Sequence, residues 1–550
     1  MFKKQVYFFR NFFTHNLYFL LPLFLFLLLL ARNPFSERNL IANFEPFPDT
    51  FHYVVPIHCL LEGQGWTICR EGRSISQSVP GFYSIFLLPF ILIENDPRVF
   101  YFLNISLSLF SFFLLVIIFR QLQISRWIQF IALGVYVTTF QVYWYPMLAM
   151  AENLLIPLVL SAVYLLIQKK LSRKQIVLAA LITTGVYATK YAALGITATL
   201  ALLFIWKIFT QEKEKKKQLT IIGMFIAISA VTFLLADNFQ IFRALIPIVQ
   251  SWIIPGSGQE NAVVADSGWW LSPEFFTKNL SFYVRGILGE SVPVLWKTDP
   301  LLPRFLLIAT VFLSVFLSVF SLNNKKSRLL TLSLFSLIFI PVIPLSFFYA
   351  PNFRYVLYII PLFILLGGVS IQSLINSAIP SQIKLIIFTV FLLFIGITFA
   401  QRLSPIKYQI SLNLKHAETP WWYIAIKEND TYLAEISSGT QRPILITAIP
   451  PHLYDFYSFG EVQLLPLSYN HDFINNRTEL WGEYDYSNLI ELYKSFIEQG
   501  NEVYVTNYGL GNEIPRQNDF ANIQQTFNLE LVRTGCHNAC NLWRVSIKPE

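Results

Sequence analysis

The chain has 550 residues, of which 54% are hydrophobic and only 13% are charged, and its formal net charge is +8. Soluble domains have about 25% charged residues, so this composition excludes a water-soluble globular protein and makes the bilayer the solvent for most of the chain. The positive charge does not indicate nucleic-acid binding. The Lys and Arg residues stand in short clusters between apolar runs, which is the pattern that orients membrane proteins.

Uncharged stretches of about 15 to 25 residues have the length that a helix needs to cross the hydrocarbon layer. The sequence contains eleven of them: 12–31, 99–119, 127–146, 153–168, 175–189, 191–206, 218–236, 305–323, 329–349, 355–375 and 385–401. No small-residue cleavage motif follows the first stretch, so we expect a retained membrane helix there rather than a signal peptide. The sequence therefore predicts about eleven transmembrane helices.

The basic residues predict the orientation of these helices. With the N-terminus in the cytoplasm, 18 Lys and Arg residues fall in the short cytoplasmic segments 1–11, 120–126, 169–174, 207–217, 324–328 and 376–384. The short outer segments hold two, Lys190 and Arg354. This asymmetry obeys the positive-inside rule. Counting the short apolar stretch 79–93 as a span would reverse every later cluster, so we expect a helix lying in the outer interface there.

Three long segments then lie outside the cytoplasm: the loops 32–98 and 237–304 and the tail 402–550. The tail alternates strand-like runs at 443–448, 502–506 and 542–547 with a helical stretch at 489–499. We therefore expect a membrane module over residues 1–401 and a small extracytoplasmic α/β domain over residues 402–550. The predicted fold class is a mainly α, polytopic membrane protein with a C-terminal α/β domain.

The four cysteines form two close pairs, Cys59 with Cys69 and Cys536 with Cys540, and none lies in an apolar run. Disulfides are allowed outside the cytoplasm. The spacing of the second pair also suits a metal site, but only His537 stands beside it, so we favour disulfides for both pairs.

The first outer loop carries an ordered set of motifs. Asp49 is followed by the aromatic Tyr53, then by Leu60-Leu-Glu-Gly63-Gln-Gly65, and then by the Pro80 segment that leads into the predicted interfacial helix. This order resembles the GT-C superfamily of membrane glycosyltransferases, and within it the protein O-mannosyltransferases and lipid A aminoarabinose transferases of glycosyltransferase families 39 and 83. The likeness is looser beyond the loop, but it extends over most of residues 10–400.

The resemblance implies an inverting transfer of a sugar from a polyprenyl-phosphate donor to a protein, lipid or glycan acceptor outside the cytoplasm, with Asp49 as the catalytic base. The chemistry agrees. Phosphate is a good leaving group, with a last pKa of about 6, so the acceptor alone needs a group that removes a proton, and one carboxylate suffices. The alternative is that Asp49 caps a helix in the loop, since Pro48-Asp49-Thr50 is an ordinary helix start.

Three further charged residues are candidates for the same site. Glu152 lies at the outer mouth of the fourth span, where a carboxylate is a functional hypothesis by default; the alternative is an interfacial acid exposed to water. Arg354, followed by Tyr355, stands where a lipid phosphate lies and could bind it through the guanidinium fork, or could reach ordinary headgroups. Lys190 is either a second phosphate contact or a plain hairpin tip.

His52 and Tyr53 are candidates for contact with the donor or the acceptor. His52 and His58 together with Asp49 could also hold a metal, although histidines six residues apart do not share a helix face. We expect no cofactor; a divalent cation held by Asp49 and Glu152 is the alternative.

The chain has no phosphate-binding Gly-rich loop and no zinc-protease motif. An outward-facing site has access to lipid-linked sugars rather than to cytoplasmic nucleotide sugars. A transporter or flippase for a lipid-linked substrate, or a non-catalytic scaffold, is the competing hypothesis. Transporters, however, usually show repeats and ionisable residues near the bilayer midplane, and this sequence has neither.

Overall fold

The computed structural model describes residues 18–31, 49–70, 73–75, 80–94, 99–212, 214–237, 275–287, 291–294, 297–300, 325–347, 351–377, 379–414, 421–436, 442–449, 462–468, 484–508, 514–535 and 540–549, with single residues between 451 and 458 and at 510. The chain divides into two compact units. The first comprises residues 1–32, 78–83 and 102–415, and the second comprises residues 33–77, 84–101 and 416–550.

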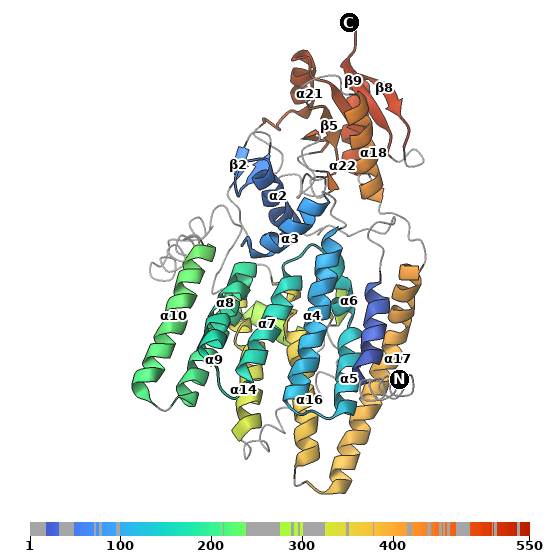
Figure 1. Cartoon of the computed structure of the whole chain (residues 1–550). Helices are drawn as coiled ribbons and strands as arrows, with labels where there is room; N and C mark the ends of the chain where they lie inside the picture. The colour runs from blue at the N-terminus through green and yellow to red at the C-terminus, as the bar shows by residue number, and fades with distance from the viewer. Residues whose placement is uncertain are drawn as a thin grey trace, which may run out of the picture. The chain divides into compact units, whose positions relative to one another are not determined.

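The first unit is built from helices. Its main helices are Tyr18–Leu30, α4 (Phe100–Gln121), α5 (Arg126–Val137), α7 (Glu152–Leu166), α8 (Arg173–Thr189), α9 (Leu194–Gln211), α10 (Lys215–Asp237), α12 (Phe276–Ile287), α14 (Lys325–Phe339), α16 (Ile359–Asn376) and α17 (Ser381–Leu414). In Figure 1, α7, α8, α9 and α10 lie side by side, and α8 contacts the other three. Four of the described helices are long and apolar enough to cross a membrane, and several shorter helices are apolar as well.

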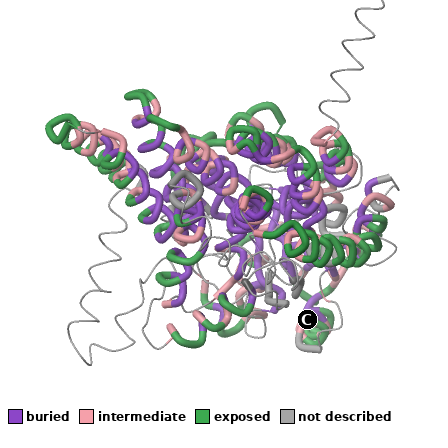
Figure 2. The backbone as a smooth tube through the Cα atoms, turned by 90° about the horizontal axis from the view of Figure 1, so that it is seen from below, coloured by how far each residue is buried: buried purple, intermediate pink, exposed green. Residues whose placement is uncertain are grey.

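Burial separates central from peripheral helices in this unit. In the most apolar window of α16, 72% of the residues are buried inside the protein, against 6% in α10. Figure 2 shows how buried residues, in purple, and exposed residues, in green, are distributed along the backbone. A helix that stays apolar on the side that no protein covers is expected to face lipid, so α10 belongs to the lipid-facing rim.

Two predicted spans are interrupted. The stretch 127–146 forms α5, α6 (Phe140–Trp144) and the 3-10 helix η2 (Tyr145–Met147), and the stretch 329–349 forms α14 and α15 (Val342–Leu345). The hydroxyls of Thr138 and Thr139 donate to the carbonyls of Gly134 and Val135 at 2.8 Å each, so side chains compete with the backbone where α5 ends. Pro341 stands at the second break, where it cannot donate a helical hydrogen bond. The predicted span 305–323 lies outside the described residues.

The last helix is longer than predicted. The sequence predicts a span over 385–401, whereas α17 has 34 residues, which correspond to about 50 Å of helix against about 30 Å of hydrocarbon. Near its end, the Asn413 side chain donates to the carbonyls of Leu28 and Leu29 at 2.9 Å, where the first helix finishes. The helical unit therefore continues past residue 401, the boundary expected from the sequence, to residue 415.

The first outer loop contributes to the second unit. Helix α2 (Asp49–Leu61) is followed by a hairpin of β1 (Ile68–Arg70) and β2 (Arg73–Ile75), and a disulfide between Cys59 and Cys69 joins the helix to the hairpin. Helix α3 (Phe82–Ile93) occupies the stretch expected to form an interfacial helix. Cys540 is also disulfide-bonded, and Cys536 lies outside the described residues.

The C-terminal part of the second unit is a five-stranded sheet in the order β6-β5-β7-β9-β8. The strands are β5 (Ile444–Thr447), β6 (Gln463–Pro466), β7 (Val503–Thr506), β8 (Phe527–Arg533) and β9 (Leu542–Ile547). The first three are parallel, and β9 runs antiparallel to both β7 and β8. Every residue of β5 and β7 is buried, as is typical of central parallel strands covered on both faces.

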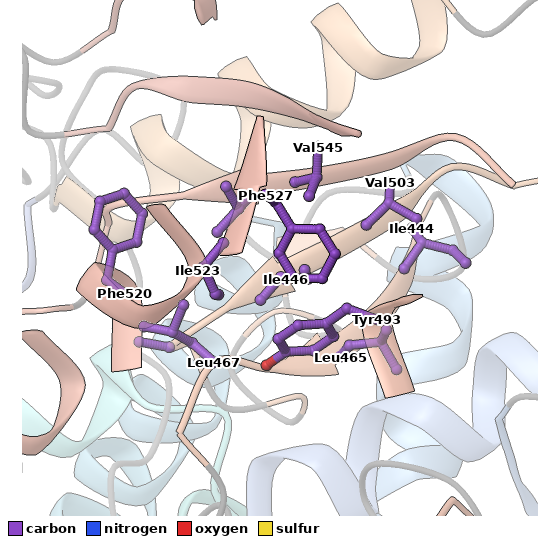
Figure 3. Packing of buried hydrophobic residues seen from close by; sticks show 12 residues of the cluster. Ile444, Ile446, Leu465, Leu467, Tyr493, Val503, Phe520, Ile523, Phe527 and Val545 are labelled. Carbon is purple, nitrogen blue, oxygen red and sulfur yellow. The ribbon is translucent and has the colours of Figure 1, made fainter. Parts of the chain in front are cut away.

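The core of this sheet is apolar and continuous. Ile446 of β5, Val505 of β7 and Val545 of β9 pack with Tyr493 of α21 (Leu489–Glu498) and Ile523 of α22 (Ile514–Thr526), as Figure 3 shows for the cluster. A third helix, α18 (Trp421–Ile436), belongs to the same unit. The C-terminal segment is therefore a mixed α/β domain, with two strands and two helices that the sequence pattern did not predict: β6, β8, α18 and α22.

Candidate active site

Glu152 is the first residue of α7, and its side chain is completely buried. The unpaired backbone N–H groups at a helix N-terminus favour a negative charge at this position. A buried carboxylate still requires a cation or several hydrogen bonds, because removing a charge from water is costly.

Lys190 supplies that cation. It ends α8, is 5% exposed, and places Nζ 2.5 Å from Oε1 of Glu152. The two residues are 38 positions apart and come from different helices, so the sequence gives no indication that they meet. The structure joins them in a buried ion pair. Such a pair holds its two side chains in a fixed arrangement even where its net contribution to stability is small.

Tyr355 extends the site from Lys190 to Arg354. The Tyr355 ring centroid lies 5.0 Å from the Lys190 ammonium and 5.1 Å from the Arg354 guanidinium, within the range of cation–π attraction. The Arg354 Nη2 group also donates to the Tyr355 hydroxyl at 3.5 Å. Glu152, Lys190, Tyr355 and Arg354 therefore form one connected row in the helical unit.

Arg354 is held by a short turn. It lies in the 3-10 helix η5 (Phe353–Val356) and is 2% exposed. The Asn352 side chain caps this helix by accepting from the Arg354 backbone N–H at 3.0 Å, and the Asn352 carbonyl accepts from the Tyr283 hydroxyl of α12 at 3.5 Å. Helix α12 thus supports the turn that carries Arg354.

Among the residues that the structure describes, the row contains two cations, Lys190 and Arg354, and one carboxylate, Glu152. Cations with low water access attract an anion more strongly than the same charges would in bulk water. The arrangement is chemically suited to hold a phosphate group and to stabilise negative charge that develops on it.

A buried amide network fixes the chain just before Glu152. Asn104 of α4 donates to the carbonyls of Pro146 and Leu148 at 3.1 and 2.9 Å and accepts from the Tyr83 hydroxyl at 2.9 Å. Asn153 donates to the carbonyls of Leu148 and Met150 at 2.9 and 3.1 Å.

The sequence analysis missed this network. The signal for Asn104 was an amide inside the apolar stretch 99–119, since polar side chains within spans bond across helices. Tyr83 and Asn153 carried no comparable signal.

Asp49, His52 and Tyr53 belong to the second unit. Asp49 is the first residue of α2, and its side chain lies outside the described part of the structure. His52 and Tyr53, on the same helix, are both buried. Among the described residues, no group of three His, Cys, Asp or Glu side chains is arranged to hold a metal ion. The structure therefore joins Glu152, Lys190, Arg354 and Tyr355, whereas the roles predicted for the α2 residues remain predictions.

Comparison with known proteins yields structural likeness alone. No protein-family model and no curated protein sequence matches the chain. Among solved structures, it is similar to ArnT from Cupriavidus metallidurans, crystallised in the apo state and bound to undecaprenyl phosphate. Each comparison has 11% sequence identity, covers 96% of this chain and 97% of ArnT, and gives a TM-score of 0.56. At this identity the likeness concerns the fold, and it confirms the fold class predicted from the sequence: the chain has the GT-C fold of polytopic membrane proteins, with a C-terminal α/β domain.

Proposed function

We propose that the protein is an inverting glycosyltransferase that transfers a sugar from a polyprenyl-phosphate donor to an acceptor outside the cytoplasm. The observation that carries the proposal is the buried row of Glu152, Lys190, Tyr355 and Arg354, which brings two cations together. It lies in a fold shared over 96% of the chain with a protein crystallised with undecaprenyl phosphate.

In this proposal Arg354 binds the donor phosphate. Its planar fork matches two phosphate oxygens, and its burial strengthens the attraction. Lys190 adds positive charge next to Tyr355, while Glu152 keeps Lys190 in place. The two cations then have a catalytic role, because negative charge grows on the phosphate as the sugar leaves.

The reaction breaks the bond between the anomeric carbon and the phosphate oxygen, and the electron pair remains on the phosphate. The acceptor oxygen or nitrogen forms the new bond to that carbon from the opposite face, so the configuration inverts. Asp49 takes the proton that the acceptor loses. No group need protonate the leaving phosphate, which is a weak base.

The chemistry needs no cofactor. We therefore expect transfer to be undiminished after chelation with EDTA; lost transfer would favour the divalent-cation alternative.

The orientation follows from the basic residues. The 18 Lys and Arg residues of the short segments assigned to the cytoplasm, against two on the other side, favour a cytoplasmic N-terminus and an extracytoplasmic C-terminal domain. Under this orientation the site takes lipid-linked sugars that have already crossed the membrane.

Reconstituted vesicles separate the enzyme from a flippase or a scaffold. The purified protein is supplied with a fluorescent polyprenyl-phosphate sugar in both leaflets and with membrane-impermeant candidate acceptors. Labelled acceptor together with released polyprenyl phosphate supports the enzyme. Movement of the donor between leaflets without transfer identifies a flippase, and donor binding with neither activity identifies a scaffold.

Gene deletion identifies the substrates. Mass spectrometry of glycans and polyprenyl phosphates, with and without the gene, should show one sugar missing from its acceptor and the corresponding lipid-linked donor accumulating. Unchanged glycans and donors would count against the proposal.

A further inference from the structure

Arg402 is a charged residue outside the row described above. It lies on α17, one residue beyond the apolar stretch 385–401, and contacts the break between α5 and α6. Its Nη1 group donates to the carbonyl of Val135 at 2.9 Å and to the hydroxyls of Thr138 and Thr139 at 3.0 and 3.3 Å. One nitrogen of the guanidinium is thus held by three neutral oxygens.

The opposite edge of the guanidinium makes no hydrogen bond to the described residues, although Tyr143 of α6 interacts electrostatically with the arginine. Its Nε and Nη2 groups make no hydrogen bond there, and no described carboxylate forms an ion pair with Arg402. These two N–H groups point in the same direction and form a fork that matches two oxygens of a phosphate or a carboxylate. The structure fixes the arginine through one nitrogen and leaves this fork available.

Close helix packing sets the position of the fork. A Cβ atom added at Gly134 of α5 would lie 3.2 Å from the Phe399 ring of α17. The two helices therefore approach each other closely, about one helical turn before Arg402. Farther along the same pair, the rings of Trp127 and Phe388 meet edge to face at 4.9 Å. Arg402 therefore projects from a rigid contact rather than from a mobile loop.

The apolar neighbours of Arg402 along α17 are exposed on the surface of the protein. Leu393, Ile397 and Leu403 are 63%, 48% and 63% exposed, as expected for side chains that the bilayer covers. A cation at the end of an apolar span lies at the depth of the lipid phosphates and is costly to leave without an anion. The ligand chemistry that fits the fork, the charge and the depth is a phosphate carried by a lipid.

We infer that the Nε–Nη2 edge of Arg402 is a binding site for the phosphate of an anionic lipid, formed by other residues than those around Arg354. The Thr138 and Thr139 hydroxyls and the Val135 carbonyl orient the guanidinium, and the fork binds two phosphate oxygens. The inference does not depend on glycosyl transfer, because its test measures lipid binding.

The test uses the full chain, purified in detergent, with lipid binding measured by native mass spectrometry. Wild-type protein should retain phosphatidylglycerol in preference to zwitterionic phosphatidylcholine. Arg402→Gln should bind phosphatidylglycerol about tenfold more weakly, and Arg402→Lys, which keeps the charge but loses the fork, should fall between the two. Lys407→Gln, at an exposed cation on the same helix, is the matched control and should bind as the wild type does.

Equal phosphatidylglycerol binding by wild type and Arg402→Gln would overturn the inference and leave Arg402 as a structural cap of α5. If that variant does not fold, the Thr138→Ala/Thr139→Ala double variant keeps the charge and leaves only the Val135 carbonyl to hold Nη1, so it should bind the lipid more weakly than wild type; unchanged binding would also contradict the inference. Competition by polyprenyl phosphate would identify a second carrier-lipid site, and its absence an ordinary phospholipid site. Equal competition by inorganic phosphate would contradict a lipid site.

Discussion

At the scale of single residues, the Glu152–Lys190 pair determines how the proposed donor site is held. Both side chains are buried, and their 2.5 Å contact connects the start of α7 to the end of α8. Removing one partner of a buried pair leaves an uncompensated charge, which typically costs about 3–5 kcal/mol, whereas replacing both with apolar groups costs much less.

We therefore expect Lys190→Met and Glu152→Gln each to lower the thermal midpoint of the purified protein, and the Lys190→Met/Glu152→Leu double variant to be more stable than Lys190→Met alone. A double-mutant cycle, completed with the Glu152→Leu single variant, measures the coupling energy. Strictly additive effects would mean that the two side chains do not interact in the folded protein.

Arg354 carries the second prediction at this scale. If it binds the donor phosphate and stabilises the charge that grows on it, Arg354→Ala should lower kcat/KM for the donor by about 10²–10³-fold, the effect of losing one such stabilising group. Arg354→Lys should be intermediate, because it keeps the charge without the fork. Initial rates at varied donor and acceptor measure the effect, with Arg285→Gln on the exposed face of α12 as the control. A loss that raises only the acceptor KM would assign Arg354 to the acceptor.

At the scale of elements, α2 carries a histidine whose protonation is influenced by a lysine of α18. Burial, aided by the charge of Lys427 in α18, lowers the pKa of His58 from 6.5 to about 4. His58 is therefore neutral in the folded protein at pH 7, and protonation below pH 6.5 favours the unfolded chain.

The stabilising effect of a neutral His58 is present in full above pH 6.5 and is lost as the pH falls toward 4, at up to about 1.4 kcal/mol per pH unit. Thermal midpoints measured from pH 7.5 to pH 5 should fall for the wild type and fall less for His58→Gln. Identical pH profiles for the two proteins would show that His58 titrates normally in the fold.

Some of the helices and strands could be predicted from the sequence pattern, and others could not. Long apolar runs predicted α4, α7, α8 and α10 to within a few residues, because a span is defined by length and composition. The breaks after α5 and α14 were not predicted, because Thr138 and Pro341 lie inside runs whose hydropathy does not change. The strand β6 (Gln463–Pro466) has no β-branched residue and ends on a proline, so its sequence does not indicate a strand, and α22 has too few apolar residues to show a helical stripe.

The site, too, could be predicted from the sequence only in part. Residue type and position were enough to select Glu152, Lys190 and Arg354 as candidates, since the short outer segments hold only two cations and Glu152 stands at the outer end of a span. Their connection through Tyr355 was not predictable, because it depends on how α7, α8 and the turn before α16 pack in three dimensions. The amide network around Asn104 was missed for the same reason.

At the scale of the whole molecule, the orientation in the membrane decides which substrates reach the site. Three exposed lysines are suited to replacement by single cysteines: Lys216 at the start of α10, Lys278 in α12 and Lys548 just after β9. The variants are Lys216→Cys, Lys278→Cys and Lys548→Cys. A membrane-impermeant thiol reagent should label residues 278 and 548 in intact cells, and residue 216 only after the membrane is opened. Labelling of 278 and 548 from opposite sides would contradict the proposed topology.

The most direct measurement of the proposed function is a transfer assay of wild type and Asp49→Asn, both purified and supplied with the same polyprenyl-phosphate sugar and the acceptor identified by gene deletion. We expect the wild type to release polyprenyl phosphate only when the acceptor is present. The variant should bind the donor with unchanged affinity and lose transfer by at least about 10²-fold, the lower range for a general base. Full transfer by Asp49→Asn would contradict the assignment of Asp49, and donor binding without acceptor-dependent release by the wild type would contradict the enzyme itself.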